Sequence, residues 1–182
     1  MSILVLKRPS LADVEKIEEY RAEFPAERMR VTYDPERIPG LDYLEEYKNI
    51  SDWLTFCEAM SDKISWYMCV RESDQRIVGF LCFRHRLEYD DDDPEFCSHF
   101  GYSIRPSEQR NGYAKEQLRL GLEKAKGLGL TSVRVICRDI NIGSEKTILA
   151  NGGIYLDTIH GEESGMNVNR YDIPLQPQPF IQ

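Results

Sequence analysis

The segment from Gly101 to Ala114 passes from a strand through a short polar loop into a helix, and this change limits the possible folds most. Tyr102 and Ile104 favour an extended strand. Pro106 ends that strand because proline has no N–H group to donate to a neighbouring strand. From Ala114 onward, alanine and leucine recur at helical spacing, which predicts a helix over residues 114–126.

The loop Gln109–Ala114 is therefore expected at the N-terminus of that helix. The first N–H groups of a helix have no partners within it, and the helix dipole adds partial positive charge there. Arg110 and Lys115 contribute full charges, and Gly112 lets a ligand approach the backbone closely. This combination is suited to a pyrophosphate group.

Two well-known phosphate loops, G-x-x-x-x-G-K-[ST] and G-x-G-x-x-G, do not occur in the sequence. Residues Gln109–Ala114 read Q-x-x-G-x-A, which resembles the acetyl-CoA loop Q/R-x-x-G-x-G/A of the GNAT N-acetyltransferase family. The context also fits, because the long helix is followed by a strand (133–138), by Asn141 and by a short helix (144–150). The resemblance covers most of the chain and is most specific from Gly101 to Gly153.

The resemblance implies that acetyl-CoA is the cosubstrate. The residues expected to bind it are Ser103, Ile104, Arg105, Gln109, Arg110, Asn111, Gly112, Tyr113, Ala114, Asn141 and Ser144. In the family the loop amides hold the pyrophosphate and the preceding strand, here Tyr102–Arg105, pairs with the pantetheine arm. Asn141 and Ser144 are placed beside the pantetheine and its sulfur. Taken alone, Asn141 is also typical of a turn, and Ser144 of a helix N-cap.

Proton transfer has three candidate residues: His99, Glu95 and Ser144. Many members of the family carry a tyrosine acid in the helix after the asparagine, but this position holds Ile148. Ser144 or a water is the alternative acid, and a thiolate can also leave unaided because thiols are fairly acidic. Histidine is the first candidate base because it titrates near neutral pH, and Glu95 acting through water is the second. An ordinary half-buried strand residue is an equally good interpretation of His99.

The resulting hypothesis is an N-acetyltransferase that moves the acetyl group from acetyl-CoA directly to a primary amine in a ternary complex. No cysteine adjoins a histidine, so no covalent enzyme intermediate is implied. The alternative is a CoA-binding module of the same fold with little or no turnover, which the missing tyrosine favours slightly.

The acceptor is expected to be a small-molecule or peptide amine. The acidic block Asp90–Asp93 indicates a solvated loop first, and an electronegative mouth for a cationic amine second. A cation site is a distant third interpretation because the EF-hand pattern is missing.

Composition argues against several other classes. The 182 residues carry a net charge of −8, which disfavours nucleic-acid binding. The five cysteines show no C-x-x-C spacing and are interpreted as buried apolar residues in a reducing compartment. Because the three histidines are scattered, no metal site is expected. No signal peptide or run of membrane-spanning length is visible, so a cytoplasmic protein without membrane contact is expected, and a homodimer is left open.

The predicted order of elements is β-α-α-β-β-β-α-β-α-β-β. This order predicts an α/β (α+β) fold with a mixed, mostly antiparallel central sheet and helices on both faces. We expect one domain over residues 1–173 and a proline-rich tail over residues 174–182. The charged sequence Arg84-His85-Arg86 predicts an exposed end of its strand.

Overall fold

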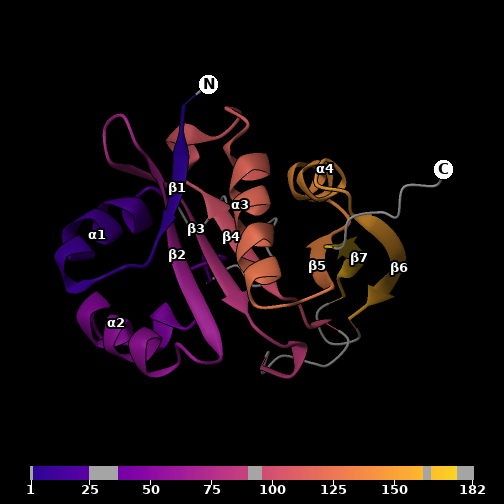
Figure 1. The fold of residues 1–182 in the computed structure, drawn as a ribbon, viewed down its shortest axis with the longest axis horizontal. Coiled ribbons are helices and arrows are strands. Elements are labelled where there is room, and N and C mark those ends of the chain that lie inside the picture. Colours follow the sequence, from indigo (N-terminus) through magenta and orange to yellow (C-terminus); the bar gives the residue numbers. More distant parts are fainter. Residues whose placement is uncertain (1, 25–36, 90–95, 162–164, 176–182) are drawn as a thin grey trace.

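The computed structural model describes residues 2–24, 37–89, 96–161 and 165–175, and gives them an α+β fold (Figure 1). The strands are β1 (Leu4–Lys7), β2 (Ile64–Arg71), β3 (Arg76–Arg84), β4 (Phe100–Ile104), β5 (Ser132–Arg138), β6 (Ile154–His160) and β7 (Asn167–Pro174). The α-helices are α1 (Val14–Ala22), α2 (Ile50–Ala59), α3 (Tyr113–Gly127) and α4 (Ile142–Leu149). A short 3-10 turn, η6 (Pro106–Glu108), lies between β4 and α3. The order of strands and α-helices is the predicted one.

The strands form two antiparallel sheets rather than one continuous sheet. The first sheet has four strands in the order β1-β2-β3-β4, and the second has three in the order β5-β7-β6. In Figure 1 the smaller sheet lies to the right of the larger one, with α4 above it. The predicted antiparallel α+β class is confirmed, and the separation of β4 from β5 proves to be the feature that positions the site.

Helices cover both faces of the larger sheet because successive strand residues point to opposite sides. Phe80 belongs to a core cluster with residues of α1 and α2, such as Trp53. Its neighbour Leu81 belongs to a second cluster with Leu118 and Leu122 of α3. The backbones of α3 and β3 lie so close that a Cβ atom at Gly121 would be 2.9 Å from the side chain of Leu81. This packing fixes the start of α3 relative to β4.

Two helix starts lie away from where the sequence indicated them. Helix α2 is capped by Asn49, whose side chain accepts a hydrogen bond from the Asp52 amide, and not by a cap at Ser51. Helix α4 is capped in the same way by Asn141, whose Oδ1 accepts from the Ser144 amide at 3.1 Å. Because Asn141 takes the cap, the side chain of Ser144 is left for other contacts.

At the C-terminal end, β7 continues to Pro174, and Leu175 is buried in the core beside α3 and β5. The packed body thus extends two residues past the expected boundary at 173, and residues 176–182 lie outside the described part. All five cysteines are free and buried, as predicted. In the part of the chain that the structure describes, no helix is long and apolar enough to cross a membrane.

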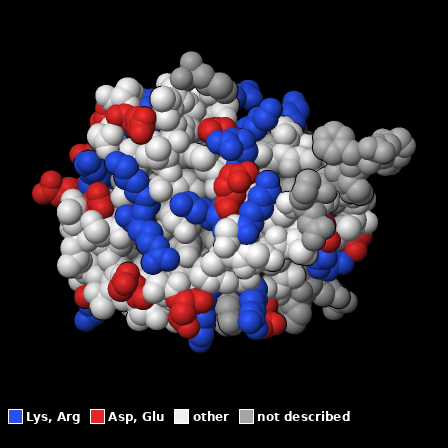
Figure 2. Space-filling view, in the orientation of Figure 1, with Lys and Arg blue, Asp and Glu red and all other residues white. Residues whose placement is uncertain are grey.

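Surface charge is mixed on the face that carries α3. Figure 2 shows basic and acidic side chains interspersed across this face. Along α3, Arg119 pairs with Glu116 and Lys126 with Glu123, one turn apart in each case. Such exposed pairs contribute little stability and are typical of a solvated helix surface.

Candidate active site

Strands β4 and β5 meet at one point and then part, and we call this arrangement the fork. At its base, the His99 amide donates to the Arg134 carbonyl at 2.9 Å, and the Arg134 amide donates to His99 Nδ1 at 2.8 Å. Beyond this contact the two strands belong to different sheets. Farther along, the hydroxyl groups of Tyr102 on β4 and Ser144 on α4 lie 2.8 Å apart. The fork thus has His99 at its base and Ser144 farther along, and the sequence singled out both residues.

One edge of β4 has no partner strand. The Arg105 amide donates to the Val78 carbonyl and the Arg84 amide to the His99 carbonyl, both at 2.8 Å, so these residue pairs face each other across β3 and β4. In an antiparallel pair the main-chain groups of alternate residues point to opposite edges. The peptide groups of Tyr102 and Ile104 therefore face the fork. This edge offers hydrogen bonds to an extended ligand lying between β4 and β5.

The fork leads to the loop Gln109–Ala114 at the start of α3. Gly112 and Arg110 both have positive φ values, of 77° and 68°. The first helical hydrogen bond runs from the Glu116 amide to the Gly112 carbonyl, so the amides of Tyr113–Lys115 have no partner within the helix. Gln109 Nε2 donates to the Ile104 carbonyl at 3.3 Å and ties the loop to the end of β4. The geometry matches the anion-binding helix start that the sequence predicts.

A network of ion pairs fixes the turn η6 just before this loop. Glu23, at the end of α1, accepts hydrogen bonds from the Ser107 amide at 3.2 Å and the Ser107 hydroxyl at 2.6 Å. It also pairs with Arg105 at 3.0 Å and with Arg76 at 3.2 Å. Burial works to raise the pKa of Glu23, but the hydrogen bonds from Ser107 and the charges of Arg105 and Arg76 outweigh it and hold the pKa below its usual range.

Glu108 closes the same network from the other side. Its carboxylate accepts from Arg71 and from Arg76, both at 2.8 Å, and the residue is only 8% exposed. The turn before the loop is thereby anchored to the ends of β2 and β3 as well as to α1. Such anchoring allows the loop to present its amides in a fixed orientation.

Ser103 and Arg105 point away from the fork. The Ser103 hydroxyl lies 2.9 Å from the Tyr20 hydroxyl of α1, and the buried Arg105 guanidinium lies 5.4 Å from the centre of the Tyr20 ring. The main-chain groups of both residues face β3. Of the four strand residues expected to bind the cosubstrate, Tyr102 and Ile104 are thus the two whose main-chain groups face the fork, and the Ile104 carbonyl already accepts a hydrogen bond from Gln109.

His99 is buried at the base of the fork. Burial is the main cause that lowers its pKa to about 4, and the positive charges of Arg134 and Arg84 act in the same direction. Because Nδ1 already accepts that hydrogen bond, the imidazole has one nitrogen left, and in the neutral ring that nitrogen carries the proton. This geometry favours a structural role for His99 over that of a base. Glu95 and the acidic block Asp90–Asp93 lie outside the described residues.

Asp42, which the sequence did not single out, lies beside β4. Its carboxylate accepts from the Gly40 amide and from Arg84 Nη2, both at 2.9 Å. It also lies over β4, because a Cβ atom at Gly101 would be 3.1 Å from Asp42 Oδ2. Arg84, expected to be exposed, is 6% exposed because it pairs with this carboxylate. The next residue, Tyr43, has an unusual φ of 70°, which no sequence pattern indicated.

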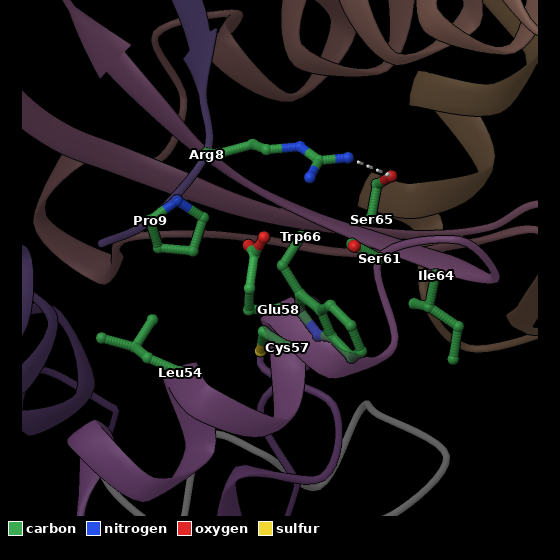
Figure 3. Close-up of a pocket in the computed structure, with 9 residues that line it drawn as sticks. All are labelled: Arg8, Pro9, Leu54, Cys57, Glu58, Ser61, Ile64, Ser65 and Trp66. Atoms are coloured by element: carbon green, nitrogen blue, oxygen red, sulfur yellow. Dashed lines mark hydrogen bonds between the residues drawn. The ribbon is translucent and has the colours of Figure 1, made fainter. Parts of the chain in front are cut away.

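A small cavity lies elsewhere, between α2 and the start of β2 (Figure 3). It is lined by Arg8, Pro9, Leu54, Cys57, Glu58, Ser61, Ile64, Ser65 and Trp66. Its volume of about 30 Å³ accommodates one or two water molecules. A nucleotide-sized ligand does not fit there, so the fork and its loop remain the candidate site.

The sequence matches the family model of the acetyltransferase (GNAT) domain over residues 4–154. No curated protein matches it with significance. Among solved structures it is similar to RimL, a ribosomal L7/L12 α-N-protein acetyltransferase solved with coenzyme A. The TM-score is 0.71 at 14% identity, over 96% of this chain and 95% of that one.

It is also similar to the microcin C7 self-immunity acetyltransferase MccE, solved with acetyl-CoA and AMP. This match has a TM-score of 0.69 at 16% identity and covers 94% of this chain and 92% of the other. A third similar structure is the Salmonella typhimurium acetyltransferase that modifies the N-terminal serine of the 50S protein L7/L12. Its TM-score is 0.69 at 14% identity, and 96% of each chain is covered. Identities this low establish a common fold.

Proposed function

Because the chain belongs to the GNAT acetyltransferase family and is therefore an acetyl-CoA-dependent N-acetyltransferase, we propose that it transfers the acetyl group directly to a primary amine within a ternary complex. The observation that carries this proposal is the unpaired edge of β4, which leads from the fork to the loop at the start of α3. Together they provide strand-like hydrogen bonds for an amide-containing arm and helix amides for a pyrophosphate.

In the proposed complex the loop amides from Arg110 to Lys115 hold the pyrophosphate, and Gly112 keeps space for it, since nothing lies within 4 Å of a Cβ atom placed there. The pantetheine arm lies along the peptide groups of Ile104 and Tyr102. A main-chain N–H on this edge polarises the thioester carbonyl, which needs no special side chain. Asn141 acts indirectly, by capping α4 and so fixing Ser144.

The acceptor amine is proposed to approach from the face of β4 that carries α1, where Asp42 lies over Gly101. In the reaction the amine nitrogen bonds to the carbonyl carbon, the carbon–sulfur bond breaks and sulfur leaves with the electron pair. The nitrogen must be neutral to attack, although amines are mostly protonated at neutral pH. Asp42 is therefore proposed to hold the cationic amine close to the thioester, and His99 to maintain the base of the fork.

The acceptor class follows from this acidic contact. A cationic amine, either a small molecule or a peptide N-terminus, suits Asp42 better than a neutral or anionic compound. One similar structure is described as modifying the N-terminal serine of a ribosomal protein, and another was solved with acetyl-CoA and AMP, so the screen includes both peptides and small molecules.

The experiment is a screen for thiol release from acetyl-CoA with polyamines, aminoglycosides, amino acids and N-terminal peptides. We expect cationic amines to give the highest kcat/KM, and N-acetylated versions of the same amines to give none. Release that is independent of every amine would contradict transfer to nitrogen and indicate hydrolysis instead.

A further inference from the structure

Tyr102 and Ser144 connect two elements across the fork through their side chains. The hydroxyl oxygens lie 2.8 Å apart, although the residues are 42 positions apart in sequence. Tyr102 comes from the unpaired edge of β4, and Ser144 from the first turn of α4. Among the described residues, the Ser144 hydroxyl has two side-chain hydrogen-bond partners, the Tyr102 hydroxyl and the Cys137 thiol.

The position of this pair relative to the cosubstrate rests on the proposed function. The arm of acetyl-CoA enters at the loop, passes Ile104 and runs toward the base of the fork. There the His99–Arg134 contact closes the space between the strands. The arm must therefore end beside Tyr102, and its terminal sulfur comes to lie near the hydroxyl that Tyr102 holds.

The direction of the hydrogen bond follows from acidity. A phenol is a stronger acid than an aliphatic alcohol, so it is the better donor of the two. Burial also raises the pKa of Tyr102 well above its usual value, so the phenol keeps its proton. With the Tyr102 hydroxyl donating to Ser144 Oγ, Ser144 keeps its own proton for a second partner, and that partner is the Cys137 thiol, which is a weak acceptor.

We infer that Tyr102 is a positioning residue, which aims the hydroxyl of Ser144 at the sulfur of the bound cosubstrate. When the carbon–sulfur bond breaks, sulfur gains the electron pair and the Ser144 hydroxyl donates a hydrogen bond to the resulting thiolate. The proton lost by the amine passes to solvent, and the thiolate takes up a proton from water. A donor fixed before the reaction stabilises this charge without reorganisation.

Other titratable groups face the pair and are included in its test. The Cys137 thiol on β5 hydrogen-bonds to the Ser144 hydroxyl, and burial raises the pKa of this thiol to about 11, so it stays neutral and a weaker acceptor than a thiolate. Glu145 on α4 accepts a hydrogen bond from the Tyr171 hydroxyl of β7 at 3.0 Å. Glu145 is engaged by Tyr171, and the Cys137 thiol is a weaker hydrogen-bonding group than the Tyr102 phenol, so Tyr102 has the larger influence on the orientation of Ser144.

The test compares the binding of CoA and desulfo-CoA by calorimetry, which requires no acceptor. The parent protein should bind CoA more tightly than desulfo-CoA, and the ratio should grow as pH rises and the thiol ionises. Ser144→Ala should lower that ratio about tenfold or more, the usual loss for a hydrogen bond to a charged group. Tyr102→Phe should also lower the ratio of CoA to desulfo-CoA affinity, while leaving the affinity for desulfo-CoA itself unchanged.

Controls separate this inference from the proposed function. Tyr155→Phe removes a hydroxyl that bonds Thr158 on the exposed strand β6 and should leave the ratio unchanged. Cys137→Ala tests whether the thiol contributes to the pH dependence. Equal binding of CoA and desulfo-CoA by parent and variants would overturn the role of the pair and leave the binding loop intact. Failure of the parent to bind either ligand would overturn both.

Kinetics provide a second measurement. Tyr102→Phe should lower kcat more than it changes KM for acetyl-CoA, and Tyr102→Phe with Ser144→Ala should be no slower than Ser144→Ala alone. If the losses in kcat of the two single variants added up in the double variant, Tyr102 would not be acting through Ser144, and the inference would be overturned. Should Tyr102→Phe fail to fold, 3-fluorotyrosine placed at position 102 keeps the shape and strengthens the donor. The ratio of CoA to desulfo-CoA affinity should then rise, and a fall would contradict the inference.

Discussion

His99 and Arg134 exchange two hydrogen bonds, at 2.9 and 2.8 Å, and this contact joins the two sheets. The second bond ends on a ring nitrogen, so it exists only while the imidazole is neutral. Protonation of His99 would place a second proton where the Arg134 amide points.

Acidic pH should therefore lower the free energy of unfolding, because His99 becomes protonated and loses this hydrogen bond. Its folded-state pKa of about 4 lies below that of an unfolded histidine, near 6.5, so its contribution is complete above about 6.5 and is lost as pH falls toward 4. The loss amounts to about 3 kcal/mol. His99→Asn, whose Oδ1 can accept the same bond without titrating, should reduce the dependence. Urea unfolding at pH 7 and pH 4.5 measures it, with the exposed His160→Asn as the control.

Gly112→Glu should abolish binding of acetyl-CoA, because it places bulk and negative charge beside the proposed pyrophosphate site. Gly129→Glu is a matched control: its φ of 82° is close to the 77° of Gly112, and a Cβ atom meets nothing within 4 Å at either position. Both changes impose similar backbone strain of about 1 kcal/mol. Calorimetry on the folded variants should show a loss of affinity for acetyl-CoA in Gly112→Glu but not in Gly129→Glu. If Gly112→Glu bound acetyl-CoA as tightly as the parent protein, the assignment of the loop would be wrong.

Asp42→Asn should raise KM for a cationic amine about tenfold, as expected when a hydrogen bond to a charged group is lost, and leave KM for acetyl-CoA unchanged. Asp52→Asn removes the same charge at the exposed start of α2 and serves as the control. Steady-state kinetics with the best amine of the screen measure both constants. An unchanged acceptor KM would return Asp42 to the role of a structural partner for Arg84.

Glu23→Gln should lower the free energy of unfolding by about 1–3 kcal/mol, because Arg76 and Arg105 lose their charged partner. It should also raise the Kd for acetyl-CoA, because Glu23 holds the turn before the binding loop. Glu19→Gln, on the exposed face of α1, should do neither. Unfolding and calorimetry on one preparation test both parts, and a stability loss without any change in Kd would separate the network from the loop.

Local patterns in the sequence predicted the order of the elements and the start of the helix that follows the proposed binding loop. The change of period near Pro106, the position of Gly112 and the spacing of Asn141 after β5 are all local features, and local features determine where elements begin and end. The exact cap of α4 was harder to assign because both Asn141 and Ser144 are good cap residues.

Two contacts at the candidate site join residues that are far apart in the sequence, and local patterns could not predict them. Asp42 and Arg84, like Tyr102 and Ser144, are 42 residues apart and lie on different elements. Nothing near Arg84 in the sequence indicated a buried partner, so a charged strand end suggested exposure. The role of Tyr102 was hidden because a tyrosine in a strand is ordinarily interpreted as a packing residue.

The unpaired edge of β4 has a consequence for how this protein avoids aggregation. An exposed strand edge is a template on which another protein chain can add a strand, and natural proteins usually cover or blunt such edges. Here the edge is inside the molecule, with β5 joined to it at Arg134 and α4 joined to it at Ser144. The same architecture that offers strand pairing to a cosubstrate thus withholds it from neighbouring proteins.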